Sequence, residues 1–159
     1  MNVTSLSSSS LSPSGKAPAT PSAVGVVLVT HTDYGARLLT PAEFILGDQR
    51  GCAAVSVDGT HEVERTLETL RQAVQVNDTG KGVIVLTDMF GGTPTNLSLS
   101  LLTTMPLEVV TGVNLPMLLK VLGSRAMDLS ALAKEAKSAG CLGIVVANEL
   151  LRARVKDKG

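Results

Sequence analysis

Four runs of apolar, mostly β-branched residues punctuate the chain, and each is followed by turn residues and then by a helical pattern. The runs show no polar alternation, which is typical of strands that helices cover on both faces. They span residues 23–30, 52–57, 82–87 and 107–111. Because strands alternate with helices, we expect an α/β fold with an open, doubly wound, mainly parallel sheet and helices on both faces.

The first predicted helix ends at Gly47 and contains a proline. Its expected inner face consists of Ala36, Leu39, Ala42, Phe44 and Ile45. Pro41 would cost about 3 kcal/mol inside a helix. In an alternative, Thr40 is the N-cap of a shorter helix with Pro41 at its first position. We prefer one kinked helix across residues 36–46.

The spacing of apolar residues predicts four further helices. The second runs from Val63 to about Val76, with Val63, Leu67, Leu70 and Val74 on one face. The third runs from Pro94 to about Thr103 behind Thr93 as N-cap, and the fourth is initiated by Pro116. The fifth is capped by Asp128 and runs through Ser138 until Gly140 stops it. A last apolar run, Ile144 to Ala147, has no partner that the sequence assigns.

The folded part is predicted to be one domain, residues 23–151, between two tails. Residues 1–22 are rich in Ser, Pro and Thr and are expected to be disordered, and residues 152–159 form a charged tail. The first stretch lacks the basic start and the apolar middle of a signal peptide. No apolar run approaches the roughly 20 residues that cross a bilayer. We expect a soluble, cytoplasmic protein.

Composition narrows the classes of function. Only 2% of the residues are aromatic against 44% hydrophobic, so the core is built from Val, Leu, Ala and Ile. Fourteen basic residues balance 14 acidic ones, which gives no overall field to attract nucleic acid. Cys52 and Cys141 lack metal-ligand spacing, so we expect two buried thiols, no metal site and no cofactor.

Two polar residues stand where predicted strands end. His31 follows the first run and Asp88 follows the third. Ligands of open α/β sheets bind outside the carboxyl ends of the strands, where chain order reverses. A carboxylate there could fix the histidine tautomer and leave the other ring nitrogen as a nucleophile. The second histidine, His61, is read as a solvated residue at the start of a helix.

The residues Gly91, Gly92 and Thr93 lead into the third helix and predict an anion site at its first turn. No Walker lysine, GxGxxG, nucleophile elbow or acidic magnesium cluster is present in the sequence, which disfavours a nucleotide-dependent kinase. A nucleophilic histidine, an orienting carboxylate and an anion cradle together suit a phosphoryl group carried on a ring nitrogen.

Three motifs of the sequence are specific enough to compare with a known family. They are Val-Leu-Val-Thr-His at 27–31, Thr-Asp-Met-Phe-Gly-Gly-Thr-Pro-Thr-Asn at 87–96, and Val-Thr-Gly-Val-Asn-Leu-Pro-Met at 110–117. In this order they resemble the mannose-type enzyme IIA of the bacterial sugar phosphotransferase system. The likeness spans residues 24 to about 146.

The resemblance implies a phosphotransferase that accepts a phosphoryl group from phospho-HPr on His31 and passes it to a IIB protein for sugar transport. It assigns Asp88 to orientation of the histidine, Thr93 to the phosphoryl group, and Met89 and Phe90 to partner docking. It also implies a homodimer in which a C-terminal edge strand is exchanged, with peripheral contact to membrane transport components. From the balanced charge we expect no nucleic-acid partner.

One departure from the family is that Thr32, rather than glycine, follows the histidine. Two other functions remain open at this stage. One is a regulatory signalling module whose partner binding depends on phosphorylation of His31, without sugar transport. The other is a binder of small anions or nucleotides that uses the same cradle.

Overall fold

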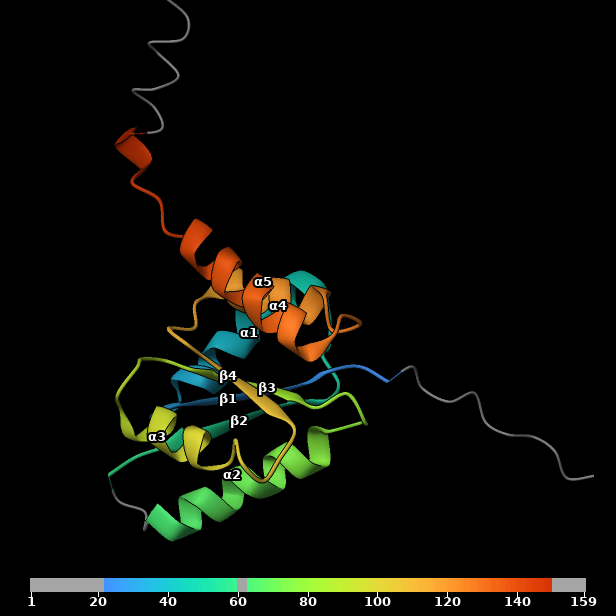
Figure 1. The fold of residues 1–159 in the computed structure, drawn as a ribbon. Coiled ribbons are helices and arrows are strands. Elements are labelled where there is room, and N and C mark those ends of the chain that lie inside the picture. Colours follow the sequence, from blue (N-terminus) through green and yellow to red (C-terminus); the bar gives the residue numbers. More distant parts are fainter. Residues whose placement is uncertain (1–21, 60–62, 150–159) are drawn as a thin grey trace, which may run out of the picture.

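Four parallel strands form one sheet in the order β2-β1-β3-β4 (Figure 1). The computed structural model describes residues 22–59 and 63–149. The strands are β1 (Gly25–His31), β2 (Cys52–Val57), β3 (Val83–Thr87) and β4 (Leu107–Thr111). All three pairings are parallel, which confirms the predicted doubly wound α/β fold.

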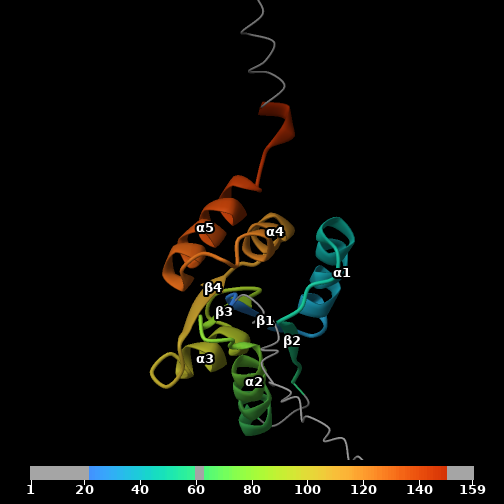
Figure 2. The same ribbon diagram turned by 90° about the vertical axis from the view of Figure 1, so that its right-hand side faces the viewer.

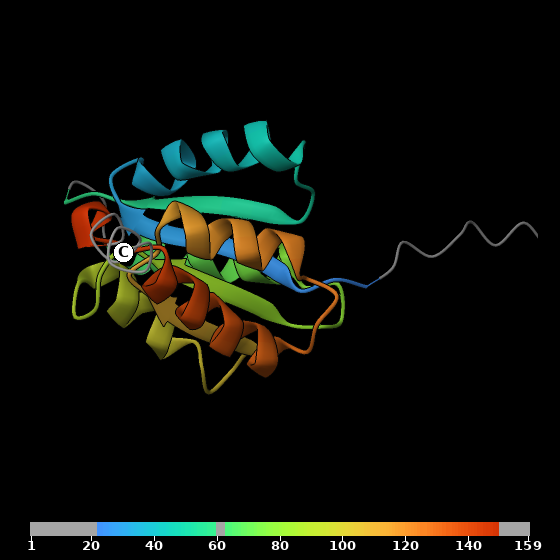
Figure 3. The ribbon, with the colours of Figure 1, turned by 90° about the horizontal axis from the view of Figure 1, so that it is seen from above.

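Helices cover both faces of this sheet. They are α1 (Tyr34–Leu46), α2 (Val63–Asn77), α3 (Thr93–Ser100), α4 (Leu115–Gly123) and α5 (Leu129–Leu142). Figures 1 and 2 show α1, α4 and α5 on one face and α2 with α3 on the other. Seen from above, α1, α4 and α5 lie side by side over the sheet and run roughly along its strands (Figure 3). The sheet is therefore the middle layer of three.

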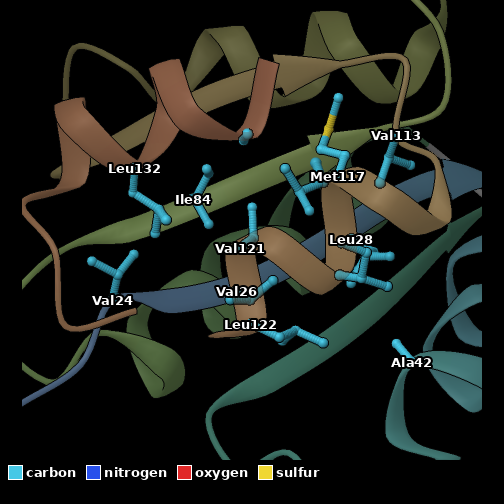
Figure 4. Packing of buried hydrophobic residues seen from close by; sticks show 13 residues of the cluster. Val24, Val26, Leu28, Ala42, Ile84, Val113, Met117, Val121, Leu122 and Leu132 are labelled. Atoms are coloured by element: carbon cyan, nitrogen blue, oxygen red, sulfur yellow. The ribbon is translucent and has the colours of Figure 1, made fainter. Parts of the chain in front are cut away.

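Two apolar clusters fill the space on either side of the sheet. Successive strand residues point to opposite faces, so Val26 and Leu28 join the cluster under α4, whereas Val27 and Val29 join the one under α2. All four are fully buried. Figure 4 shows side chains of β1 and β3 meeting those of α4 and α5. As the composition predicts, aliphatic residues make up both clusters.

The order of the strands places the reversal of the chain between β1 and β3. The chain moves from β1 outward to β2 and then returns to the other side of β1 with β3. Val29 lies opposite Thr87 in this pair, so the carboxyl ends of β1 and β3 finish almost level. This is the edge at which an open α/β sheet forms its crevice.

The amino ends of β1 and β2 are held by one guanidinium group. Arg125, in the turn between α4 and α5, donates to the carbonyl oxygens of Val24 at 2.6 Å and Gly51 at 3.2 Å, and also to that of Arg50. Charge-assisted hydrogen bonds of this kind are among the stronger ones in proteins. Arg125 therefore fixes the end of the sheet that lies opposite the crevice.

The inner face of the first helix differs from the one predicted from the sequence. The helix continues through Pro41, which excludes the alternative with Thr40 as N-cap. Its inner face includes Gly35 and Ala42, whereas Phe44 is 91% exposed and Ile45 and Ala36 are also exposed. A Cβ on Gly35 would lie 3.0 Å from the Leu28 Cβ, so this close approach sets which side of the helix faces the sheet.

Other helix predictions were wrong at single residues. Val63 is exposed at the start of α2. The N-cap of α3 is Gly92, and Thr93 is the first helical residue. Gly140 does not stop α5, which runs to Leu142. At Gly140 a Cβ would lie 2.7 Å from the Met117 Cε, so this glycine lets α5 pack closely on α4.

The end of the described chain departs from the helical layers. Ile144, Val145 and Val146 form neither helix nor strand, and all three are exposed. Contrary to expectation, Cys141 is exposed, and Cys52 is half-buried. The predictions for residues 1–21, His61 and residues 150–159 lie outside the described residues. Within the described ranges, no helix is long and apolar enough to cross a membrane.

Candidate functional site

The structure brings His31 and Asp88 into contact at the crevice. His31 is the last residue of β1, and Asp88 directly follows β3. The His31 Nδ1 lies 2.8 Å from the Asp88 Oδ2, and the His31 backbone N–H donates to the same oxygen at 2.9 Å. The predicted meeting of these two residues is therefore present, and two bonds to one carboxylate oxygen define it.

This contact fixes the tautomer of the neutral imidazole. A carboxylate oxygen can only accept a hydrogen bond, so Nδ1 must carry the proton. The other ring nitrogen, Nε2, then has a free lone pair. The His31 side chain is 46% exposed and that of Asp88 only 17%, so the imidazole ring is accessible to solvent while the carboxylate beside it is shielded.

The Asp88 carboxyl is held in its ionised form. Its partial burial acts to raise the pKa, but hydrogen bonds from the backbone and ring of His31 and the backbone of Met89 outweigh this effect. The net result is a pKa of Asp88 below its ordinary value. Asp88 is thus a fixed negative charge beside His31 at neutral pH.

A pocket of about 280 Å³ adjoins the histidine. His31 and Thr93 line it together with residues of β2, the turn after β2, α2 and α3: Val57, Asp58, Gly59, Val63, Thr66 and Leu97. Helix geometry leaves the N–H groups of Thr93 and Thr95 without helical partners, and Pro94 has none. The predicted cradle thus shares a pocket with the proposed nucleophile.

Gly91 and Gly92 of the loop each require glycine, but for different structural reasons. Gly91 has a φ of 82°, which disfavours a side chain, yet an added Cβ there would meet nothing within 4 Å. Gly92 has an ordinary φ of −86°. A Cβ on Gly92 would lie 2.8 Å from the Cε1 and 3.3 Å from the Nε2 of His31. Gly92 therefore keeps open the space beside the ring.

The two apolar residues of the loop are exposed. Met89 is 56% exposed and Phe90 is 76% exposed. Neither lines the pocket at His31. Phe90 instead lines a groove of about 600 Å³ that runs along β4 between α3 and α5. The loop that holds Asp88 therefore also borders a second surface.

Sequence reasoning missed three features of the site. Asp58 lines the pocket beside His31, although the sequence indicated only a turn residue. Its position at the carboxyl end of β2 could have pointed to the site. Thr32 has a φ of 52°, a left-handed conformation that is strained for a β-branched residue. Thr95 is fully buried and donates to the Met89 carbonyl at 2.6 Å. No spacing rule pointed to Thr95, whereas the sequence showed Thr32 only as a residue that stands where the family has glycine, without its backbone conformation.

The sequence matches a known protein family over most of its length. The sequence model of the family described as "PTS system fructose IIA component" covers residues 25–137. The chain belongs to this family. The matched range contains His31, Asp88 and the loop 91–93, and the family confirms the resemblance stated from the motifs.

Two individual proteins are similar to this IIA family member over about two thirds of its length. It is 32% identical over 108 residues to the PTS system mannose-specific EIIAB component of Escherichia coli (strain K12). That alignment covers 67% of this chain and 33% of the relative, so the chain spans about a third of that protein. It is 30% identical over 103 residues to the PTS system fructose-specific EIIA component of Bacillus subtilis (strain 168), covering 64% of this chain and 70% of the relative.

Solved structures show the same fold. Phosphotransferase system component EIIA from Streptococcus agalactiae superposes with a TM-score of 0.72 at 27% identity, covering 79% of this chain and 98% of that one. The mannose/sorbose-specific IIA subunit from Enterococcus faecalis gives a TM-score of 0.71 at 25% identity, covering 78% and 94%. The IIA architecture therefore accounts for nearly the whole of each of these chains.

Proposed function

We propose that this protein is a phosphoryl carrier of a sugar phosphotransferase system, with His31 as the residue that is phosphorylated. The observation that carries the proposal is the 2.8 Å contact between His31 Nδ1 and Asp88 Oδ2. This contact leaves Nε2 as the nucleophile in a ring whose side chain is 46% exposed. Membership of the IIA family supports the same role.

The chemistry requires only a nucleophilic substitution at phosphorus. The Nε2 lone pair of His31 attacks the phosphorus of a phosphohistidine donor, and the P–N bond of the donor breaks as the new P–N bond forms. The donor imidazole keeps the electron pair of the broken bond. Nδ1 of His31 retains its proton, so positive charge develops on the ring, and the Asp88 carboxylate stabilises that charge.

The pocket suits temporary rather than permanent storage of the phosphoryl group. Its described lining residues include Thr93 and Asp58 but no Lys or Arg. Backbone N–H groups at the start of α3 and the Thr93 hydroxyl would bind the phosphoryl oxygens. An arginine would hold a dianion more strongly. Binding by dipoles beside an aspartate keeps the group transferable, as a carrier requires.

The family supplies the expected donor and acceptor. We assign phospho-HPr as donor and a IIB protein as acceptor, in the cytoplasm and with peripheral contact to membrane transport components. The exposed Met89 and Phe90, which follow Asp88 in the loop, would contact these partners, because docking of a partner at this loop would bury apolar side chains that are otherwise exposed.

The test is phosphorylation of the full chain with phosphoenolpyruvate, enzyme I and HPr. We expect His31→Ala to abolish incorporation, whereas His61→Ala serves as the matched control and retains it. Equal incorporation into the His31→Ala protein would refute the assignment. Addition of IIB then distinguishes two roles: rapid loss of the phosphoryl group indicates a relay, and a stable phosphoprotein indicates a regulatory module.

Asp88→Asn tests the orienting charge in the same assay. Asparagine can still accept the Nδ1 hydrogen bond through its one oxygen, but it lacks the charge and turns an NH2 group toward the Met89 N–H. Loss of the charge is a difference of about 1–1.5 kcal/mol, which corresponds to at least roughly tenfold slower transfer. Thr93→Ala should have a smaller effect. Asp48→Asn is the control, since Asp48 is an exposed carboxylate at the opposite end of α1. If Asp88→Asn transferred at the wild-type rate, Asp88 would be only a loop residue.

The same proposal includes a homodimer. Among the described residues no strand pairs with the outer edge of β4, and a groove of about 600 Å³ runs beside it. Ile144 and Val146 are 77% and 59% exposed in the segment that leaves α5 (Figure 1). Such an edge and such a segment are normally covered. Exchange of this segment between two copies would cover both.

Light scattering during size-exclusion chromatography tests this assembly. We expect the wild type to be a dimer and Val145→Lys to dissociate, because a lysine in the middle of the exchanged segment would have to be buried between the two copies. Lys156→Ala adds a charge change in the C-terminal tail as a control. A dimer that is unaffected by Val145→Lys would contradict exchange of this segment.

A further inference from the structure

Two threonine hydroxyl groups meet in the interior directly behind the loop that carries Asp88. Thr87 ends β3, Thr95 lies in the first turn of α3, and both are fully buried. Their Oγ1 atoms are 2.8 Å apart. The Thr95 Oγ1 also lies 2.6 Å from the carbonyl oxygen of Met89. The three oxygens form a short chain from the sheet to the loop.

The direction of this chain is fixed by chemistry. A carbonyl oxygen only accepts, so the single hydroxyl proton of Thr95 is donated to Met89. Thr95 must then be the acceptor in its contact with Thr87, and Thr87 is the donor. Thr87 is itself anchored, because its backbone carbonyl accepts from the N–H groups of Gly112 and Val113 at 2.9 Å each. Thr95 thus ties the loop to a rigid part of the sheet.

The loop residue that Thr95 holds is the one that positions Asp88. The Met89 N–H donates to Asp88 Oδ1 at 3.0 Å, while the carbonyl of Met89 is held by Thr95. The other carboxylate oxygen, Oδ2, accepts both bonds from His31. Both oxygens of Asp88 are therefore oriented, one by the loop and one by the histidine.

We propose that Thr95 is a positioning residue for His31. Its hydroxyl fixes the backbone of Met89, which orients the Asp88 carboxylate and so holds His31 in the tautomer with the proton on Nδ1. Thr95 does not touch the reacting nitrogen and acts only through this series of bonds. The consequence for phosphoryl transfer rests on the proposed function, but the consequence for the tautomer does not.

The decisive variant is Thr95→Val, which has nearly the same shape and lacks the hydroxyl. The readout is the ¹⁵N NMR spectrum of the His31 imidazole in the full-length, unphosphorylated protein at a pH where the ring is neutral. We expect wild type and Thr95→Ser to show mainly the Nδ1–H form, and Thr95→Val to show a mixture with the Nε2–H form. Thr87→Val leaves the bond from Thr95 to Met89 in place and should retain the wild-type tautomer.

A double variant distinguishes an effect on the His31 tautomer from a general loss of stability. Thr95→Val leaves the buried Thr87 hydroxyl without its acceptor, whereas the double variant Thr87→Val/Thr95→Val removes both hydroxyl groups. The double variant should show the same mixture of tautomers. Wild-type tautomer populations in a folded Thr95→Val or double variant would overturn the proposal.

Phosphorylation by phospho-HPr provides the independent second readout. We expect transfer to Thr95→Val to be several-fold slower, less than the roughly tenfold expected for loss of the Asp88 charge because that charge remains, and to recover in Thr95→Ser. If wild type accepted no phosphoryl group, the proposed function would fail while the tautomer measurement still decided the role of Thr95. Unchanged tautomers in a folded valine variant would remove Thr95 from the site even if wild type were phosphorylated.

Discussion

Replacement of Gly92 by alanine tests whether open space beside the histidine ring is essential. Gly92 has φ −86° and ψ 172°, a conformation that alanine adopts without strain. The only new feature is a methyl group 2.8 Å from the His31 Cε1 and 3.3 Å from the Nε2. Gly92→Ala is therefore a steric change aimed at the nucleophile.

The size of the effect follows from how the ring is held. Carbon atoms pack at about 3.5–4.0 Å, so the Cε1 must move by roughly 0.7 Å. Cε1 is bonded to Nδ1, which lies 2.8 Å from Asp88 Oδ2, so the movement lengthens or bends this hydrogen bond. Loss of a charge-assisted bond costs about 1.5–3 kcal/mol, which corresponds to roughly 10- to 150-fold slower transfer.

Gly91→Ala is the matched control, because it adds the same methyl group one residue earlier. At Gly91 a Cβ would meet nothing within 4 Å, but φ is 82°. Alanine there should lower the free energy of unfolding by about 1 kcal/mol and leave transfer nearly unchanged. Gly92→Ala should lose only about 0.5–1 kcal/mol of helix capping.

Rapid-quench measurement of phosphoryl transfer from phospho-HPr, beside urea unfolding, separates the two variants. The expected pattern is a slow but folded Gly92→Ala protein and an active but less stable Gly91→Ala protein. Transfer to Gly92→Ala within about twofold of wild type, well below the effect of one lost charged hydrogen bond, would refute the steric argument.

Two further predictions concern neighbours of His31. Thr32→Gly should raise the free energy of unfolding by about 0.5–1 kcal/mol, because relief of the left-handed strain at φ 52° exceeds the entropy cost of glycine. Thr32→Ala keeps the Cβ and should gain less. A urea midpoint of Thr32→Gly below that of wild type would contradict this prediction. Because the folded state lowers the pKa of Asp88, its contribution to stability is complete above the unfolded value of about 3.9 and is lost as pH falls through the folded value. The difference in unfolding free energy between wild type and Asp88→Asn should therefore shrink as pH is lowered from about 5 towards 3, and a difference that persisted would show that Asp88 does not titrate as inferred.

The strands and the contact between His31 and Asp88 could be predicted because both depend on local and repetitive rules. Continuous β-branched runs indicate buried parallel strands, and β2 and β4 have the predicted bounds. β1 and β3 start level and β1 runs only two residues further, so the polar residue that ends β1 and the one that follows β3 meet at one edge. No knowledge of tertiary packing was needed for either conclusion.

The faces of helices and the roles of single small residues depend on which element packs against which. The close approach of Gly35 to Leu28 decides the orientation of α1, so Phe44 is exposed although it is apolar. Gly140 resembles a helix stop in sequence, yet in the structure it is a contact with Met117. A pattern of residues along one element does not contain the identity of its neighbour, and these predictions failed for that reason.

The two ends of the sheet are held by different kinds of hydrogen bond. This difference determines whether a substitution mainly changes the free energy of unfolding or the rate of transfer. At the amino ends, Arg125 donates to backbone carbonyls of the residues just before β1 and β2, so it supports the framework itself. At the carboxyl ends, His31, Asp88 and Thr95 are joined through side chains and one loop peptide. Removal of one side chain from that series leaves the strands and both apolar clusters in place. Variants at the carboxyl end should therefore change the rate of transfer more than the free energy of unfolding, which is the separation that the Gly92, Asp88 and Thr95 variants exploit.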